Sequence, residues 1–204
     1  MSGRSIDELL ENLHSLEEEV ESAIEQRLKE KRQEFRYQVD QRKVRFEAGI
    51  HALQRKYRVG LWAYLIEARL LHILTAPFIY FVFFPFAFLD LAVTVYQHVC
   101  FRVYGIPLVR RKDHIVIDRH QLAYLNAIEK FNCVYCSYGN GLIEYAREIS
   151  ARTEQYWCPI KHGRRTADPH RRMEAFVDFG DADNYRGRLS ELRETLKELQ
   201  KSDT

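Results

Sequence analysis

Residues 70–101 form an apolar stretch that limits what this chain can fold into more than any other feature. Their sequence is LLHILTAPFIYFVFFPFAFLDLAVTVYQHVCF, in which Asp90 carries the one formal charge. A helix that spans a bilayer needs about 20 consecutive apolar residues, whereas runs of ~10–14 are typical of buried core helices. The stretch therefore predicts a membrane segment.

Pro77 and Pro85 interrupt this segment. Proline removes a backbone donor and disfavours the helical conformation in the residue before it. The halves on either side of Pro85 would each be roughly 22–24 Å long as helices, which is shorter than the ~30 Å hydrocarbon core. The sequence therefore predicts a re-entrant hairpin, and a single kinked span is the alternative.

Basic residues flank the segment on both sides. Those before it are Arg55, Lys56, Arg58 and Arg69, and those after it include Arg102, Arg110, Arg111, Lys112 and Arg119. A basic excess marks the cytoplasmic side of a membrane protein, so both flanks are expected there. The N-terminal MSGRSIDELLENL also lacks the basic start and apolar run of a secretory signal, which agrees with a cytoplasmic location for most of the chain.

Asp90 has two interpretations. A carboxylate inside a membrane segment often has a function and a partner, and His98 and His72 are the candidates for that partner. The favoured prediction is that Asp90 lies at headgroup depth, near a bend in the segment.

Residues 1–69 are predicted to form one long helix that enters a coiled coil. Charge changes along it, because residues 1–30 carry nine acids and three bases whereas residues 31–69 carry ten bases and four acids. The apolar residues recur every three or four positions, as a stripe that needs a partner helix. They are Leu9, Leu13, Leu16, Val20, Ile24, Leu28, Phe35, Val39, Phe46, Ile50, Leu53 and Tyr57.

Residues 181–204 predict a second, shorter amphipathic helix. Leu189, Leu192, Leu196 and Leu199 form its apolar stripe. Such a short helix is marginal alone in water, so it is expected to pack on the N-terminal leucines or on another subunit.

Residues 102–180 are predicted to form a small helical module around three cysteines. In the pattern Cys133-x2-Cys136-x21-Cys158-x3-His162, each pair could supply two corners of a tetrahedral zinc site. The interpretation places a helix before Cys136, a turn at SYGNG and a second helix from about Leu142 to Trp157. An iron–sulfur cluster, a redox dithiol and inert core cysteines are the alternatives.

The block YLNAIEKFNCVYCSYGNGLIEYAREISARTEQYWCPIKH, residues 124–162, resembles one in bacterial membrane-associated proteins that have no assigned activity. The resemblance covers about a third of the chain, including the cysteines of this block. It implies attachment to a bacterial inner membrane and adds no chemistry.

Basic residues after the membrane segment and in KHGRRTADPHRR are expected to bind anionic headgroups, each with roughly 1 kcal/mol. They are Arg102, Arg110, Arg111, Lys112, Arg164, Arg165, Arg171 and Arg172. No nucleic-acid fold signature accompanies them, which disfavours nucleic acid as a partner.

No common catalytic or nucleotide-binding motif occurs in the sequence. The expected fold is mainly α: a coiled-coil helix, a proline-broken membrane hairpin or span, a Cys3His-type metal module and a C-terminal amphipathic helix. The expected function is a non-enzymatic, membrane-anchored scaffold that binds lipid and forms homo-oligomers or binds a partner protein through its coiled coil. A redox or electron-transfer subunit of a membrane complex is the alternative.

Overall fold

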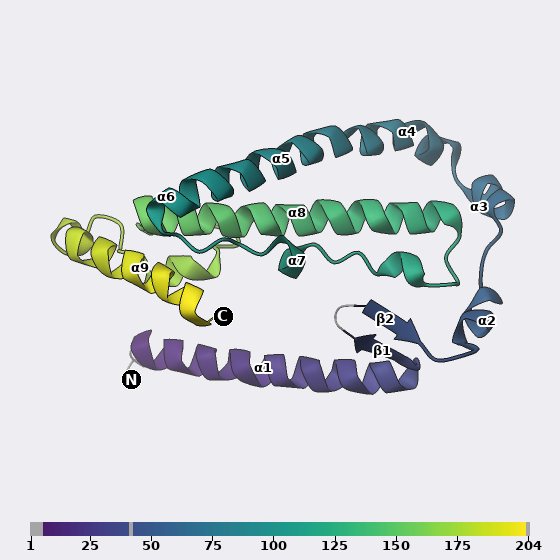
Figure 1. The fold of residues 1–204 in the computed structure, drawn as a ribbon, viewed down its shortest axis with the longest axis horizontal. Coiled ribbons are helices and arrows are strands. Elements are labelled where there is room, and N and C mark those ends of the chain that lie inside the picture. The colour runs from purple at the N-terminus through teal and green to yellow at the C-terminus, as the bar shows by residue number, and fades with distance from the viewer. Residues whose placement is uncertain (1–5, 41–42, 203–204) are drawn as a thin grey trace. The chain divides into compact units, whose positions relative to one another are not determined.

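The fold was analysed in a computed structural model, which describes residues 6–40 and 43–202. The chain is mainly helical and divides into two compact units (Figure 1). One unit comprises Met1–Val59 with Gln121–Asn126, and the other comprises Gly60–His120 with Ala127–Thr204.

The first unit begins with helix α1, Ile6–Glu34. The helix ends because Arg36 adopts a left-handed conformation, with φ of 52°, that a right-handed helix does not contain. The single helix predicted over residues 1–69 is therefore wrong beyond Glu34. Leu9 belongs to the predicted stripe, but its side chain lies outside the described part of the chain.

A β-hairpin and a short helix follow. Strands β1, Tyr37–Asp40, and β2, Lys43–Phe46, pair antiparallel, with Tyr37 opposite Phe46 and Val39 opposite Val44. These four residues alternate with polar ones, which is the period of a strand rather than of a helix. Helix α2, Ile50–Arg55, then supplies Gln54, whose Oε1 accepts a hydrogen bond from the amide of Ala123.

The second unit begins with helix α3, Leu61–Glu67, and continues into the apolar segment. This segment consists of α4, Leu70–Phe81, α5, Phe83–Tyr96, the π-helix η1, Gln97–Phe101, and α6, Arg102–Tyr104. Together they form one 35-residue helical run, Leu70–Tyr104, long and apolar enough to cross a membrane. The run does not reverse direction, so the predicted hairpin is not formed (Figure 1).

The prolines fit into this run without folding it back. Pro85 is the third residue of α5, where a backbone N–H would have no helical acceptor within the same helix. The break falls at Val82, whose amide bonds to Ile79 O at 3.2 Å instead of to a carbonyl four residues back. Pro77 lies inside α4.

Helix α8, Ala127–Trp157, is the centre of the second unit and runs alongside α5 in the same direction (Figure 1). It passes without interruption through SYGNG, so the turn predicted there is wrong. The segment that returns from α6 to α8 contains α7, Arg111–His114, and η2, Arg119–Gln121. An added Cβ on Gly141 would come within 2.7 Å of His114 O in this segment, and one on Gly139 within 2.7 Å of the Phe86 ring. These glycines permit close packing.

Helix η3, Arg171–Ala175, and helix α9, Ala182–Ser202, complete the second unit. Leu189, Leu192 and Leu196 are buried, and α9 packs on α8. Gln155 of α8 donates to Leu192 O at 2.9 Å. The amphipathic helix is thus confirmed and its partner within this unit is α8; the side chain of Leu199 lies outside the described part.

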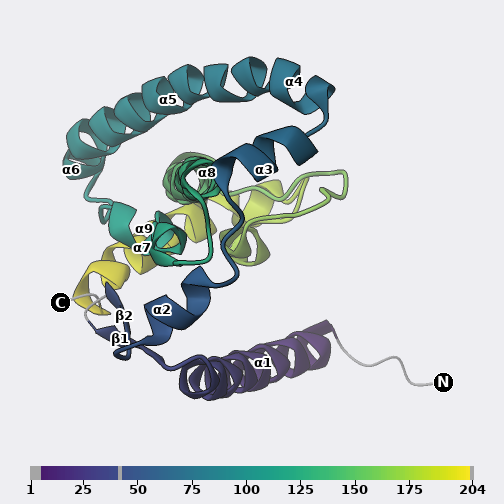
Figure 2. The same cartoon turned by 90° about the vertical axis from the view of Figure 1, so that its right-hand side faces the viewer.

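The core of this unit lies where the apolar run, the return segment and α8 meet. Its buried residues are Phe101, Ile106, Val109, Leu142, Tyr145 and Ile149. Figure 2 shows α4 and α5 arching over one side of α8, with α9 on another side. One face of α5 is thereby left uncovered.

Candidate functional site

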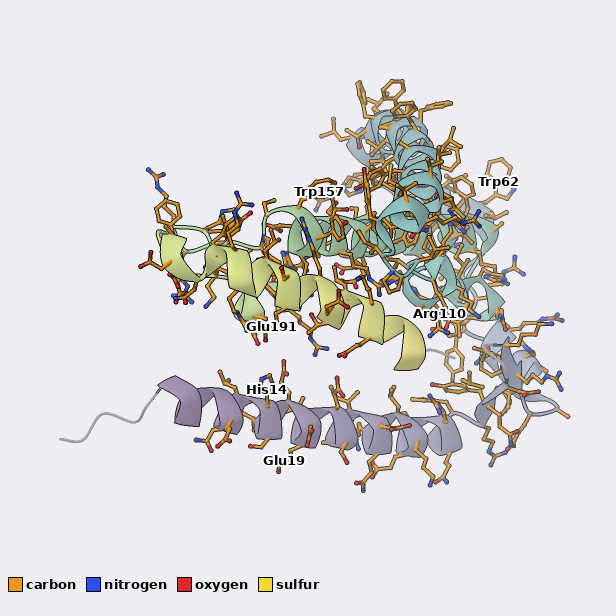
Figure 3. The ribbon with its side chains drawn as sticks, turned by 60° about the vertical axis from the view of Figure 1, so that its left-hand side comes forward. His14, Glu19, Trp62, Arg110, Trp157 and Glu191 are labelled. Atoms are coloured by element: carbon orange, nitrogen blue, oxygen red, sulfur yellow. The ribbon has the colours of Figure 1, made fainter. Side chains whose placement is uncertain are left out.

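The uncovered face of α5 and of the helical turns after it is apolar. Phe84, Phe88, Leu91, Val95, Val99 and Val103 recur every three or four residues and are between 54% and 77% exposed. Carbon atoms dominate the side chains around this part of the ribbon (Figure 3). A surface helix of a water-soluble protein has the reverse arrangement, with polar residues outside and apolar residues inside.

The face of α5 that packs on α8 contains a polar cluster centred on Asp90. Arg111 donates to both carboxylate oxygens, from Nε to Oδ1 at 3.2 Å and from Nη2 to Oδ2 at 2.6 Å. The Tyr138 hydroxyl donates to Oδ2 at 3.0 Å. The side chain of Asp90 is 17% exposed and that of Arg111 is 48% exposed. Neither His98 nor His72 is the partner that the sequence suggested.

This pairing holds Arg111 in its charged form. The hydrogen bond to Asp90 raises the pKa of the Arg111 guanidinium further above its already high value. Burial raises the pKa of the Tyr138 hydroxyl, and the hydrogen bond to Asp90 raises it again. The tyrosine therefore stays protonated and remains a hydrogen-bond donor.

Gln97 forms a second polar contact on the same inner face, two helical turns after Asp90. It is buried within the π-helix, and its Oε1 accepts a hydrogen bond from the Val109 amide at 2.9 Å. Its Nε2 donates to the Tyr145 hydroxyl and to Val109 O, the latter at 3.4 Å. The π-helical turn widens the helix at the point where this side chain binds the return segment.

An apolar groove lies beside the Asp90 cluster, between the apolar run and α8. It has a volume of about 700 Å³. Its lining consists of Tyr80, Phe83, Phe84, Asp90, Arg111, Ile117, Phe131, Val134, Tyr135 and Tyr138. Ligand-binding clefts typically have volumes of roughly 300–1,000 Å³, apolar walls and a few polar groups that fix orientation. The groove has each of these properties.

The cysteines predicted as metal ligands lie far apart. Cys133 and Cys136 are in the first third of α8, whereas Cys158 follows its last residue, Trp157. At 1.5 Å per residue, Cys136 and Trp157 are about 32 Å apart along the helix. Among the described residues, no three His, Cys, Asp or Glu side chains come together as a metal site.

His162, the fourth predicted ligand, is exposed in the loop after α8. Partial burial raises the pKa of the Cys158 thiol, and Glu154 raises it further. Zinc, like the iron–sulfur alternative, stays a prediction that elemental analysis of the purified protein can test.

The basic residues predicted to bind headgroups divide into two groups. Arg111 binds Asp90, Arg110 pairs with Asp113 at 3.0 Å, and Arg172 is only 18% exposed because it binds Glu148. These three side chains make ion pairs within the fold, and Arg110 and Arg111 are nevertheless exposed. The second group, also exposed, includes Arg102 and Lys112, together with Arg164 and Arg165, which line a hollow of about 350 Å³.

Arg172 belongs to a network that joins η3, α8 and α9. Its Nη2 donates to Glu148 Oε1 at 2.6 Å, and its Nη1 donates to Gln155 Oε1 at 3.0 Å. Burial raises the pKa of Glu148, but hydrogen bonds from Arg172 and Arg152 outweigh it, and the pKa lies below its usual value. The network is structural, since it holds the buried carboxylate charged.

No known protein family, curated protein or solved structure matches this chain. The resemblance of the cysteine block to bacterial membrane-associated proteins therefore stays a prediction. The features of the fold that bear on its function are the apolar face, the Asp90 cluster and the groove.

Sequence reasoning missed the Asp90 cluster because its members are far apart in the sequence. One signal was available: Asp90, Thr94 and Gln97 are spaced four and three residues apart and so lie on one face of a helix. Polar residues gathered on one face of an apolar helix indicate that this face packs against protein.

Proposed function

We propose that this protein is a non-enzymatic scaffold anchored in a membrane by the outer face of its apolar helix. In this proposal Phe84, Phe88, Leu91 and Val95 insert into the hydrocarbon while α8 stays on the aqueous side. The observation that carries the proposal is the inverted arrangement of α5, apolar outside and polar inside. An exposed apolar surface of this extent is unfavourable in water.

We favour an orientation of α5 parallel to the membrane surface over one that spans the bilayer, because α8 packs alongside α5. Helix α8 runs along it and includes the exposed residues Asn140 and Glu144. If α5 crossed the bilayer, these groups would enter hydrocarbon, where a charged side chain costs about 2.5–3.5 kcal/mol at the centre of a helix. A shallow position avoids that cost. Location at the cytoplasmic face of a bacterial inner membrane remains part of the proposal.

The scaffold role is inferred from α1. Its stripe residues Leu13, Leu16, Val20, Ile24 and Leu28 are between 44% and 57% exposed. Each half-covered leucine loses contact with water when a second helix packs on the stripe, which stabilises association by roughly 25 cal/mol per Å² of apolar surface buried. We propose that α1 pairs with a second copy or with a partner protein.

Flotation with phosphatidylcholine–phosphatidylglycerol vesicles tests the membrane part of the proposal. Replacing Leu91 by Glu, alone or with Phe88→Glu, should lower vesicle binding at least about tenfold, because burial of one such side chain is worth about 1.5–3 kcal/mol. Ile143→Glu, on the exposed face of α8, is the matched control and should float like the unaltered protein. Equal flotation of the Leu91 and Ile143 variants would refute the proposed orientation.

A further inference from the structure

We propose that the groove between the apolar run and α8 binds one acyl chain of an anionic phospholipid, whose phosphate lies at Arg111. This inference rests on the proposed membrane location but goes beyond it, since a protein can be held at a membrane without selecting any lipid.

The groove is long. A second hollow of about 470 Å³ lies next to it and is lined by Leu61, Trp62 and Leu65 of α3 and by the start of α8. Tyr80 and Phe131 line both hollows, and their rings are in edge contact with centroids 5.3 Å apart. From Ala127 to Tyr138 along α8, the two hollows together extend about 17 Å. An elongated, narrow ligand fits this course.

The walls offer a ligand little besides aromatic rings. The Tyr80 hydroxyl donates to Asn132 Oδ1 at 2.7 Å, and the Tyr135 hydroxyl donates to Ile79 O at 2.6 Å. These two polar atoms are therefore already hydrogen-bonded within the fold. A ligand in the groove therefore contacts mainly the faces and edges of aromatic rings. A hydrocarbon chain suits such walls, because it has no polar group that would be left without a hydrogen bond.

One end of the groove is polar. Arg111 donates to Asp90 through Nε and Nη2, and among the described residues its Nη1 donates no hydrogen bond. Asp90 is hydrogen-bonded by Arg111 and Tyr138, so its charge is balanced locally. The free guanidinium donors suit the oxygen atoms of a phosphate, and the next residue in the sequence, Lys112, is exposed.

The groove is also continuous with the face proposed to contact hydrocarbon. Phe83 and Phe84 line the groove and are at the same time exposed residues of the apolar helix. A chain from a neighbouring lipid could enter between these rings without crossing water. This continuity favours a membrane lipid over a segment of another protein as the occupant.

Photo-crosslinking of the full chain in detergent micelles tests the inference. The probe is a phosphatidylglycerol with a diazirine in one acyl chain, and adducts are located by mass spectrometry. We expect adducts at Phe131, Val134 and Tyr135, and we expect unlabelled phosphatidylglycerol to compete them away more effectively than phosphatidylcholine does. Because this competition uses the unaltered protein, it does not depend on any variant folding.

A variant pair sharpens the test. Val134→Trp fills the groove and should lower the adducts there about tenfold, whereas Ile143→Trp, nine residues further along α8 and exposed, should leave them unchanged. Adducts that resist competition, or that persist in Val134→Trp, would overturn the inference. Since micelles contain no bilayer, groove adducts in a protein that fails to float with vesicles would refute the membrane proposal alone.

Discussion

Gly141 is the position where one added methyl group should cost this fold the most. An alanine Cβ there would lie 2.7 Å from His114 O and 2.8 Å from Ile115 Cα, closer than non-bonded atoms approach. Both contacts are backbone atoms of the return segment, so neither can rotate away. The clash would separate that segment from α8 next to the core residues Leu142 and Tyr145.

The magnitude follows from two opposing contributions. Alanine is favoured over glycine inside a helix by about 1 kcal/mol, whereas overpacking a close contact costs about 1–3 kcal/mol. With a backbone clash the upper end applies, and we expect Gly141→Ala to lower the free energy of unfolding by about 2 kcal/mol. Gly187 in α9 has no atom within 4 Å of an added Cβ, so Gly187→Ala should instead gain about 1 kcal/mol.

Thermal unfolding in detergent, followed by near-ultraviolet circular dichroism, measures this difference. The two variants should differ by about 3 kcal/mol, or roughly 6–12 °C in melting temperature for a chain of this size. Gly139→Ala should fall between them, because its clash is with the edge of the Phe86 ring, which can shift. If Gly141→Ala melted at or above the temperature of the unaltered protein, the close approach of the return segment to α8 would be refuted.

Three further predictions concern other parts of the chain. Glu148→Gln should lower the free energy of unfolding by about 1–3 kcal/mol at pH 7. Because the pKa of Glu148 is lower in the folded protein, its carboxylate stabilises the fold above the usual pKa near 4.5, and this stabilisation disappears as the pH falls through the folded pKa. In an acid titration the variant should therefore lose less stability than the unaltered protein. Leu192→Ala should cost about 2–5 kcal/mol because that side chain is buried against α8, as measured by denaturant unfolding. Leu16→Lys, on the exposed stripe of α1, should leave the melting temperature within about 2 °C but weaken self-association in sedimentation, and unchanged sedimentation would count against pairing through α1.

Local patterns predicted the elements whose evidence is contained in one continuous stretch. The long apolar helical run follows from its length and apolar composition, and the C-terminal amphipathic helix follows from the spacing of its leucines. Neither property requires knowledge of the rest of the fold.

The predictions failed where two readings of one pattern competed. The apolar residues of the β-hairpin fit the period of two that is typical of strands; they are Tyr37, Val39, Val44 and Phe46. Val39 and Phe46 also fit the stripe of the predicted long helix, so the sequence pattern alone favours a helix there. Helix α1 ends where Arg36 adopts the left-handed conformation, and arginine, unlike glycine, does not indicate that conformation in a sequence. The β-hairpin could therefore have been predicted from the sequence, but the residue at which α1 ends could not.

SYGNG failed for a different reason. Two glycines near polar residues are typical of a turn, yet Gly139 and Gly141 lie inside α8, where they allow the Phe86 ring and the Ile115 backbone to approach the helix closely. Those partners are 53 and 26 residues away in the sequence. The same separation explains the cysteine prediction, since a turn at SYGNG was needed to bring Cys136 toward Cys158, and a continuous α8 keeps them apart.

Asp90 links three parts of the second unit: α5, the return segment and α8. Within the sequence it interrupts an apolar run, and its position suggests either a functional carboxylate inside the membrane segment or a residue at headgroup depth near a bend. In the fold it binds Arg111 and Tyr138, so it fixes the return segment and α8 against the one face of α5 that contains polar groups. An ion pair in an apolar setting is favourable only when its hydrogen bonds are satisfied, and this one is satisfied on the protein side of the helix. The opposite face can then be wholly apolar, which is the condition that both membrane insertion and an acyl-chain groove require.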